Sequence, residues 1–417
     1  CKVAEIVVVG GVRRSALISL SNLTDERMRN AKMGQWWLDE TQRALSNNSV
    51  AYTEKPDVGI FLKEWMSLIA SKSGERGIFN RAAAKKQVEK LGDRRCPDYN
   101  FGTNPCSEII LRDKEFCNLT EVVVRPDDTP ESLREKVRLA SILGTWQATL
   151  TDFRYLSKEW KTNCEEEALL GVSLTGIMDN EYTNGTNVEG SLPALLNELK
   201  NIAVETNVKV AKQLDINPSA AITCVKPSGT VSQLVDASSG IHARHSPHYI
   251  RTVRGDKKDP LCQFLVEKGI PHESDLTKPE HTWVFSFPIK TAQNTICRND
   301  KTAIEQLEFW KLYQEHWCEH KPSVTITVKE DEWIDVGAWV FRNFDMISGI
   351  SFLPYSDHSY KQAPYQECSE NEYLQMLDTM PKDIDWNELS KYELEDNTIG
   401  SQEYACTGDK CEIVDIK

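Results

Sequence analysis

The chain has 417 residues, of which 40% are hydrophobic and 27% are charged, and its formal net charge is −14. Such a surplus of negative charge repels a polyphosphate backbone, which argues against a nucleic-acid polymer as partner. No apolar run approaches the roughly 18 residues that cross a bilayer, so no membrane span is predicted.

Apolar patterning indicates an α/β architecture. The run 6–9 reads as a buried strand, a turn follows at 10–14, and alternating Ala16, Ile18 and Leu20 predict a second extended segment. Helical periodicity is predicted over 58–72, 132–161, 190–214 and 302–318, and short strands over 108–111, 120–124, 221–225, 324–328 and 349–353.

The chain opens on Cys1 and enters an apolar strand almost at once. Because a domain rarely begins in the middle of its core, we expect an N-terminal portion that is missing, separately encoded or joined by processing, as at an intein junction. The 12 cysteines are scattered through a chain large enough to bury a core without disulfides, and no signal peptide is present. A reducing, cytosolic setting is therefore favoured.

The segment around Cys106 places three chemical groups close together in sequence. Pro105 disfavours a helix, and in an extended chain Asn104, Cys106 and Glu108 would point to the same side. A neighbouring carboxylate disfavours a thiolate, so this pattern suits a thiol that stays protonated and can become a neutral sulfur radical. A buried cysteine followed by a chance acid at a strand start would explain the same residues.

Further cysteines form two candidate dithiols. Cys117 precedes a predicted strand and Cys1 lies on the first one, while Cys406 and Cys411 lie in an acidic, polar extension that begins near residue 370. A dithiol supplies two electrons by closing a disulfide, and a second, tethered dithiol can reopen that disulfide by exchange. The alternative for the tail pair is a structural zinc half-site, which would need two more ligands.

Two other segments carry weaker signals. The turn 226–232 holds a glycine and three hydroxyl residues before a probable helix start, which suits an anion, although helix capping explains the same residues. His242, His245 and His248 are spaced like one helical face, but Pro247 argues against a regular helix there. A structural role is therefore favoured over a metal site for these histidines.

Together these segments resemble the large-subunit family of ribonucleotide reductases, and more closely its adenosylcobalamin-dependent class. The resemblance rests on the order and spacing of several motifs along nearly the whole chain. These are GGVRRS at 10–15, QRALSNNS at 42–49, NPCSEI at 104–109, CNLTE at 117–121, GVSLTG at 171–176, PSGTVS at 227–232, SFLP at 351–354 and the terminal cysteine pair.

The resemblance implies a fold and a division of the chain. Residues 1–373 would form a ten-stranded α/β barrel with a central finger loop, incomplete at its N-terminus. Residues 374–417 would be a flexible acidic tail that carries the redox pair Cys406 and Cys411.

The resemblance also implies roles for the site residues. Cys106 would be the thiyl radical that abstracts the ribose 3′-hydrogen, Glu108 the general base on the 3′-hydroxyl, and Asn104 a hydrogen-bond partner of the substrate hydroxyls. Cys117 would belong to the redox pair, with Cys1 as the best candidate for its partner. The substrate phosphates would be cradled by Pro227, Ser228, Gly229, Thr230, Val231 and Ser232. The tail cysteines would re-reduce the pair with electrons from thioredoxin or a similar dithiol.

The radical source is inferred from motifs that other classes carry. Tyr355, Tyr360 and Tyr365 are separate rather than tandem, and the tail lacks the glycyl-radical motif of the anaerobic class, which leaves adenosylcobalamin. The resemblance further implies a ribonucleoside di- or triphosphate substrate, a deoxynucleotide or ATP effector and a cytoplasmic location, and it allows a homodimer. The alternatives are an iron-subunit-dependent reductase, an inactive nucleotide-binding fragment and a zinc-binding module.

Overall fold

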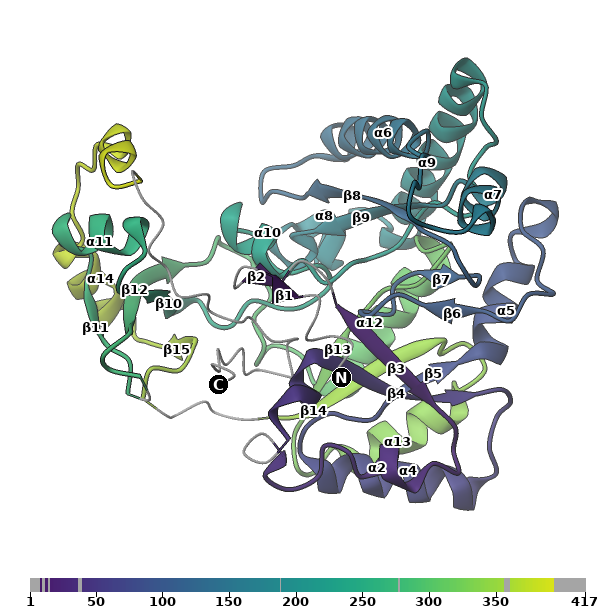
Figure 1. Cartoon of the computed structure of the whole chain (residues 1–417), viewed down its shortest axis with the longest axis horizontal. Coiled ribbons are helices and arrows are strands. Elements are labelled where there is room, and N and C mark those ends of the chain that lie inside the picture. Colours follow the sequence, from purple (N-terminus) through teal and green to yellow (C-terminus); the bar gives the residue numbers. More distant parts are fainter. Residues whose placement is uncertain are drawn as a thin grey trace. The chain divides into compact units, whose positions relative to one another are not determined.

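The computed structural model describes residues 8–9, 12–13, 16–36, 40–187, 189–276, 278–355 and 361–393. The chain forms two compact units, of which the larger comprises Leu17–Arg244 and Gln293–Tyr355. The smaller unit takes its described residues from before Leu17, between Arg244 and Gln293, and after Tyr355. Both units contain strands and helices, which confirms the predicted α/β class (Figure 1).

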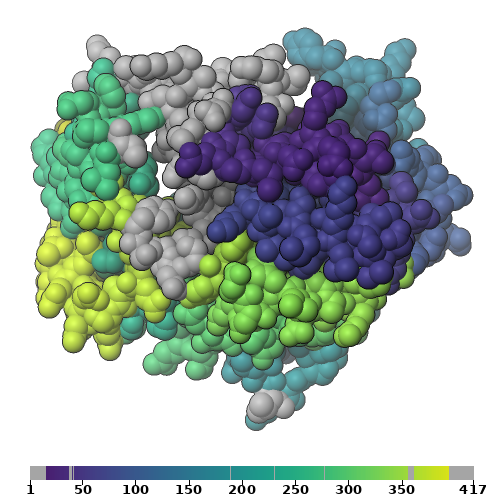
Figure 2. Space-filling model, turned by 90° about the horizontal axis from the view of Figure 1, so that it is seen from below, coloured from purple at the N-terminus to yellow at the C-terminus, as the bar shows by residue number. Residues whose placement is uncertain are grey.

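The larger unit is built on a five-stranded sheet. Its strand order is β13 (Thr325–Val328), β14 (Gly349–Pro354), β5 (Gly77–Asn80), β4 (Ser46–Tyr52) and β3 (Leu17–Ser21). The β13–β14 pair is parallel, as are β3, β4 and β5, whereas β14 and β5 run antiparallel. Two parallel sets thus meet along one antiparallel seam. Figure 2 shows the purple-to-blue N-terminal part of this unit lying directly against the light green part that carries β13 and β14.

Helices α4 (Val58–Ser71) and α13 (Trp333–Arg342) pack together beside this sheet (Figure 1). The α4 helix begins where the Asp57 side chain accepts the Ile60 N–H, and it ends at Lys72 in the left-handed region. Trp65 of α4 donates its indole N–H to the Trp333 carbonyl at 3.2 Å, and its ring packs edge-on against Phe352. Aromatic packing therefore joins segments more than 250 residues apart.

A second layer of the larger unit carries the strands that lead into the site. Strand β8 (Asn118–Val123) pairs in parallel with β9 (Leu170–Thr175), and α6 (Pro130–Gln147) and α9 (Leu192–Leu214) cover them (Figure 1). Segment 221–225 continues this layer, because Val172 donates its N–H to the Ile222 carbonyl at 2.8 Å. On its other side, Ser323 donates its N–H to the Val225 carbonyl at 2.8 Å.

Most predicted elements of the larger unit are confirmed. The predicted helices 58–72, 190–214 and 302–318 are α4, α9 and α12 (Ala303–His316), and the strands 120–124, 324–328 and 349–353 are β8, β13 and β14. Segment 221–225 forms isolated bridges, and the predicted strand 108–111 shortens to β7 (Ile110–Leu111).

One predicted helix is wrong. The single helix expected over 132–161 is two helices, α6 and α7 (Lys158–Glu167), separated by residues 148–157. Leu150 donates its N–H to the Gln147 carbonyl, a three-residue turn that ends the α-helical bonding. Thr149, Thr151 and Asp152 in this segment are weak helix formers. The next helix begins after its N-cap residue, Ser157.

The smaller unit contains an antiparallel sheet in the order β11 (His272–Ser274), β12 (Thr282–Lys290), β10 (His248–Asp256) and β15 (Tyr365–Glu367). Its helices are α11 (Pro260–Glu267) and α14 (Glu370–Thr379). The α14 helix opens with a capping box between Ser369 and Glu372 and crosses the predicted domain boundary at 373/374. The start of the predicted tail is therefore helical, and the tail beyond residue 393 lies outside the described residues.

The remaining elements are short. They are β1 (Val8–Val9), β2 (Val12–Arg13), α2 (Glu26–Arg29), η1 (Thr41–Leu45), α5 (Arg81–Glu89), η2 (Gly92–Arg94), β6 (Gly102–Thr103), η3 (Ile177–Asp179), α8 (Glu181–Asn184), α10 (Gly229–Leu234) and η4 (Trp386–Lys391). Within the described residues the sheets stay separate and none closes into a barrel, so the ten-stranded barrel stays a prediction. No helix in the described ranges is both long and apolar enough to span a bilayer.

We predict that Gly176→Ala destabilises the chain far more than Gly92→Ala. Both glycines have positive φ, but a Cβ at Gly176 would lie 2.2 Å from the Val124 carbonyl oxygen, whereas at Gly92 nothing lies within 4 Å. We expect losses of about 3 kcal/mol or more and about 1 kcal/mol, respectively. Urea unfolding of both variants measures the difference, and equal losses would rule out the steric explanation.

Candidate active site

Residues Asn104–Glu108 form a turn rather than an extended strand. Ser107 donates its N–H to the Asn104 carbonyl at 2.8 Å and adopts a φ of +65°. This left-handed residue breaks the alternation of side chains. The predicted extended conformation is therefore wrong: Cys106 is exposed and Glu108 is only 1% exposed, while the Asn104 side chain still hydrogen-bonds the Glu108 carboxyl.

The turn, here called the 104–108 loop, is held from several directions. Asn47 on β4 donates from its side-chain amide to the Pro105 carbonyl at 2.8 Å, and the Ser323 hydroxyl donates to the Cys106 carbonyl at 2.7 Å. Within the loop, the Asn104 side-chain oxygen accepts the Ile109 N–H at 3.0 Å. The exposed thiol is thus presented by a backbone fixed to both strand layers of the larger unit.

Glu108, two residues after Cys106, is buried. Burial raises the pKa of its carboxyl, while the Asn104 hydrogen bond and the positive charges of Lys321 and Lys226 act in the opposite direction. Its Oε2 atom has no hydrogen-bond partner among the described residues. A buried carboxyl with a raised pKa and one unsatisfied oxygen is suited to hold or accept a proton, as a general acid or base must.

Lys321 is a site residue that sequence reasoning missed. Its side chain is buried and its Nζ donates to the Gly349 carbonyl at 2.9 Å. Burial lowers the pKa of Lys321 to about 7, against the opposing charges of Glu108, Cys318 and Cys106. No sequence pattern marks it, because lysine is almost always a surface residue.

His320 and Arg95, two further missed residues, anchor the chain after the loop. His320 donates from Nε2 to the Leu170 carbonyl at 2.9 Å and accepts the Ile110 N–H on Nδ1. Burial lowers its pKa to about 3, so it stays neutral. Arg95 donates to the Ile110 carbonyl at 2.9 Å and to Glu167 at 2.7 Å.

Cys117 stands at the entrance of β8, partly buried against Leu169 and Ala221. Burial raises the pKa of the Cys117 thiol well above its usual range, and the charge of Glu108 adds to this. The structure therefore places Cys117 within electrostatic reach of the Glu108 carboxyl. Its proposed partner Cys1 and the tail pair Cys406 and Cys411 lie outside the described residues.

The nine cysteines in the described part of the chain are free of disulfides. Two of them are buried near the site: Cys224 within electrostatic reach of Glu108, and Cys318 within that of Lys321. Burial raises the pKa of both thiols well above the usual range. The predicted reducing setting is compatible with these thiols.

The predicted anion-binding turn 226–232 follows segment 221–225 and leads into α10. Ser228 occupies the N-cap position but makes no capping bond, and its buried hydroxyl has no partner among the described residues. Ser232 is also buried, but its hydroxyl donates to the Gly229 carbonyl at 2.9 Å. Capping therefore does not account for Ser228. The Thr230 side chain lies outside the described part.

The histidines after Gly240 have structural contacts. His242 hydrogen-bonds the Ser239 carbonyl through Nδ1 and the Thr325 N–H through Nε2, both at 3.0 Å. His245 stacks on Tyr365 and His248 packs against Tyr373 in the smaller unit. Among the described residues, no group of three or more potential metal ligands occurs.

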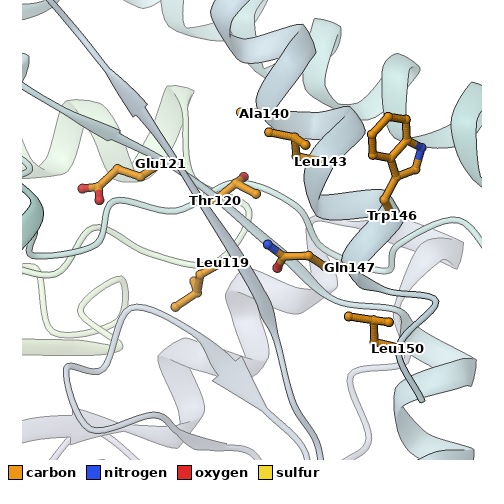
Figure 3. Close-up of a pocket in the computed structure, with 8 residues that line it drawn as sticks. All are labelled: Leu119, Thr120, Glu121, Ala140, Leu143, Trp146, Gln147 and Leu150. Carbon is orange, nitrogen blue, oxygen red and sulfur yellow. The ribbon is translucent and has the colours of Figure 1, made fainter. Parts of the chain in front are cut away.

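A separate pocket of about 430 Å³ lies between β8 and α6 in the larger unit. Figure 3 shows Thr120 of β8 beside Leu143 and Gln147 of α6, while Leu119 and Glu121 extend from the strand away from the helix. None of the residues of the 104–108 loop lines this pocket, so it is distinct from the thiol site.

Two curated relatives match most of the chain. A protein of Lactobacillus gasseri named adenosylcobalamin-dependent ribonucleoside-triphosphate reductase is 28% identical over 405 residues, covering 89% of this chain and 53% of its own length. A protein of the same name from Euglena gracilis is 25% identical over 413 residues, covering 97% and 54%. The chain is thus similar to adenosylcobalamin-dependent ribonucleotide reductases over most of its length. It spans about half the length of the curated relatives it matches.

Two solved structures have a fold similar to that of this chain. The crystal structure of a B12-dependent (class II) ribonucleotide reductase matches with a TM-score of 0.72 and 23% identity, over 94% of this chain and 56% of the other. The alpha subunit of the Actinobacillus ureae class Id ribonucleotide reductase matches with a TM-score of 0.54 and 14% identity, over 81% and 70%. No protein-family model matches the chain.

We predict that the chain loses stability as the pH rises from about 5 to 8, through Glu115. Burial and the neighbouring Glu167 raise the pKa of Glu115 to about 8, so the folded state binds the extra proton throughout that window. Glu115→Gln should flatten the decline and add roughly 1 kcal/mol at pH 8. Glu330→Gln, at an exposed acid, is the matched control. Denaturant unfolding at several pH values would contradict the assignment if both variants kept the original slope.

Proposed function

We propose that this chain is the catalytic part of a reductase that converts ribonucleoside di- or triphosphates to 2′-deoxyribonucleotides by thiyl-radical chemistry. The observation that carries the proposal is the exposed Cys106 on a fixed turn, with the buried carboxyl of Glu108 two residues further along the chain. The relatives named as triphosphate reductases support the same reaction.

Three residues of the 104–108 loop have different proposed roles in the reaction. The Cys106 sulfur, as a thiyl radical, takes the 3′-hydrogen atom of the ribose and returns it at the end of the cycle. Glu108 accepts the proton of the 3′-hydroxyl, and Asn104 hydrogen-bonds the substrate hydroxyls. In the net reaction two thiols become a disulfide, and the 2′-hydroxyl leaves as water. Cys117 is one of these thiols, and Cys1 is proposed as the other.

Adenosylcobalamin is the proposed radical source, because both relatives are named adenosylcobalamin-dependent reductases. When bound, the cofactor supplies a 5′-deoxyadenosyl radical, which is chemistry that amino-acid side chains lack. The described residues fit that chemistry, because the Cys106 thiol is exposed and a group outside the loop can reach its hydrogen atom. Cys106 is thus the residue of this chain that would face the adenosyl group, and residues toward the corrin stay unassigned.

The proposed fold is the ten-stranded barrel, with the 104–108 loop as its finger loop. Two features support this. The two parallel strand sets meet along an antiparallel seam between β14 and β5, and the loop is fixed between them by Asn47 and Ser323. Strands carried by polypeptide that this chain does not span would complete the barrel.

Substrate phosphates are proposed to bind the turn 227–232, supported by the buried, unpartnered Ser228 hydroxyl. Cys406 and Cys411 on the tail 374–417 are proposed to re-reduce the catalytic pair with electrons from thioredoxin or a similar dithiol. We also propose a deoxynucleotide or ATP effector and a partner polypeptide that is the N-terminal portion of the same enzyme. The same proposal includes a cytoplasmic location and a homodimer.

We predict that the Cys106→Ser and Cys411→Ser variants differ in which reductants still support turnover. In the complete reductase that contains this chain, Cys106→Ser should abolish reduction with every reductant, because no sulfur radical can form. Cys411→Ser should keep turnover with a small dithiol and lose it with thioredoxin. Cys96→Ser, at a second exposed cysteine, is the control and should keep both activities. Identical behaviour of the Cys106 and Cys411 variants would contradict the division of roles.

We also expect a cobalt(II)–thiyl signal in the paramagnetic resonance spectrum when the complete enzyme is mixed anaerobically with adenosylcobalamin, nucleotide and dithiol. The signal should disappear in Cys106→Ser and persist in Cys96→Ser. Turnover without such a signal would instead support an iron-subunit-dependent enzyme.

A further inference from the structure

We propose that His320 is a positioning residue of the thiol site. Its imidazole ring joins the chain that leaves the 104–108 loop to strand β9, and it thereby fixes the loop relative to Cys117. The inference rests on the proposed function, because it concerns the spacing between the radical cysteine and a redox cysteine of the same reaction. The ring itself takes no chemical step.

The two ring nitrogens of His320 contact different parts of the larger unit. Nδ1 accepts the N–H of Ile110, two residues after Glu108, at 3.3 Å. Nε2 lies 2.9 Å from the Leu170 carbonyl on β9, and because a carbonyl oxygen only accepts, Nε2 carries the proton. A single neutral tautomer thus satisfies both contacts. The side chain is 0% exposed, so solvent does not compete for either nitrogen.

Leu170 lies at the start of β9, opposite the residue that follows Cys117. Asn118 is the register partner of Leu170 in the β8–β9 pair. Its backbone N–H and its side-chain amide both donate to the Leu169 carbonyl, at 2.9 and 3.1 Å. The hydrogen bonds of the ring and of Asn118 therefore form a short path from Ile110, just beyond the loop, to the backbone beside Cys117.

The ring occupies a gap in the backbone ladder on the side of β9 away from β8. Val172 makes both of the ladder bonds expected of parallel strands there, at 2.8 and 3.0 Å. Two residues earlier, the same pattern would pair the Ile222 N–H with the Leu170 carbonyl. Instead, the Glu319 carboxylate accepts the Ile222 N–H at 2.9 Å, and the ring donates to Leu170. Two side chains thus take the place of one backbone bond, and the ring joins this position of β9 to the chain after the loop.

The consequence is a fixed relation between the loop and β8. The loop is held at its Cys106 carbonyl by the Ser323 hydroxyl, and at its Glu108 carbonyl by the Lys321 N–H at 3.2 Å. The ring belongs to the same segment, which therefore follows the loop along its length and connects it to β9. Two sulfurs that act on one substrate must both be held in place, because a displacement of about 1 Å lowers a rate strongly.

Two substitutions separate the two contacts of the ring. The asparagine amide lies about as far from the backbone as Nδ1, so His320→Asn keeps an acceptor for Ile110 and loses Leu170. The longer glutamine reaches the position of Nε2, so His320→Gln keeps a donor for Leu170 and loses Ile110. His320→Ala loses both contacts. His281→Asn and His281→Gln, at an exposed histidine of the smaller unit, are the matched controls.

Hydrogen–deuterium exchange of the chain by itself, read at single amides, is the first measurement. We expect the Ile110 amide to exchange about tenfold or more faster in His320→Gln and to stay protected in His320→Asn, because a lost hydrogen bond exposes its donor. The Gly171 amide, which shares a peptide group with the Leu170 carbonyl, should show the reverse. His320→Ala should accelerate both amides, and the His281 controls should accelerate neither.

The tautomer of the parent chain is a second measurement, and it needs no substitution. In chain labelled with ¹⁵N-histidine, the His320 ring is assigned through its nuclear Overhauser contacts with Ile110 and Leu170. Its proton should stay on Nε2 from about pH 8 to about pH 5, because burial lowers the pKa of His320 to about 3. A ring protonated on Nδ1, or one that titrates in this range, would overturn the proposal.

Turnover tests the role in the reaction. In the complete reductase, His320→Asn and His320→Gln should each lower kcat about tenfold or more with little change in KM. The cobalt(II)–thiyl signal should persist, because Cys106 stays on its loop. A substitution that merely loosened the fold would weaken the signal and turnover together, and that result would count against a positioning role.

The proposal is overturned if both variants expose the same amide while they unfold at the temperature of the parent, or if kcat is unchanged. Failure of the proposed function is a distinct result, seen as a parent enzyme that reduces no nucleotide. The exchange and tautomer measurements judge the contacts of the ring independently of that result, because they require neither cofactor nor substrate.

Discussion

The site depends on the hydrogen bonds that hold segment 221–225 between β9 and residues 321–323. Val172 binds one side of this segment and Ser323 the other, and the Ser323 hydroxyl then fixes the Cys106 carbonyl. Because backbone bonds leave little freedom in register, the thiol loop, the buried lysine and the turn that begins at Lys226 must meet at the same edge. Residues separated by more than 200 positions thereby form one chemical environment.

The ionisable side chains buried around this edge differ in how many hydrogen bonds they make. Arg95 and the neutral His320 hold the backbone that follows the loop, while Glu108 and Lys321 lie beneath it with fewer hydrogen bonds. Burial raises the pKa of Glu108 and lowers the pKa of Lys321, so the pKa values of both groups are shifted toward their neutral forms.

The chain is similar to ribonucleotide reductases in sequence and in fold, and it spans about half the length of the curated relatives it matches. The described residues contain the exposed thiol, its carboxyl and one candidate redox cysteine, Cys117. Barrel closure and the second redox thiol are the parts of the proposed cycle that involve residues outside the described ranges. Asn104, Cys106 and Glu108 all lie in the described residues, so their proposed roles can be tested by substitution.

Local sequence determined the elements and the motif. The helix over 58–72 follows from apolar spacing and a capping aspartate, and the Asn104, Cys106 and Glu108 motif pointed to the thiol site. Tertiary structure decided the rest. The left-handed Ser107 exposed Cys106 and buried Glu108, contrary to simple alternation. Lys321 joined the site because burial depends on partners distant in sequence. Periodicity and motifs are local properties, whereas burial and charge environment are set by whatever the fold brings alongside.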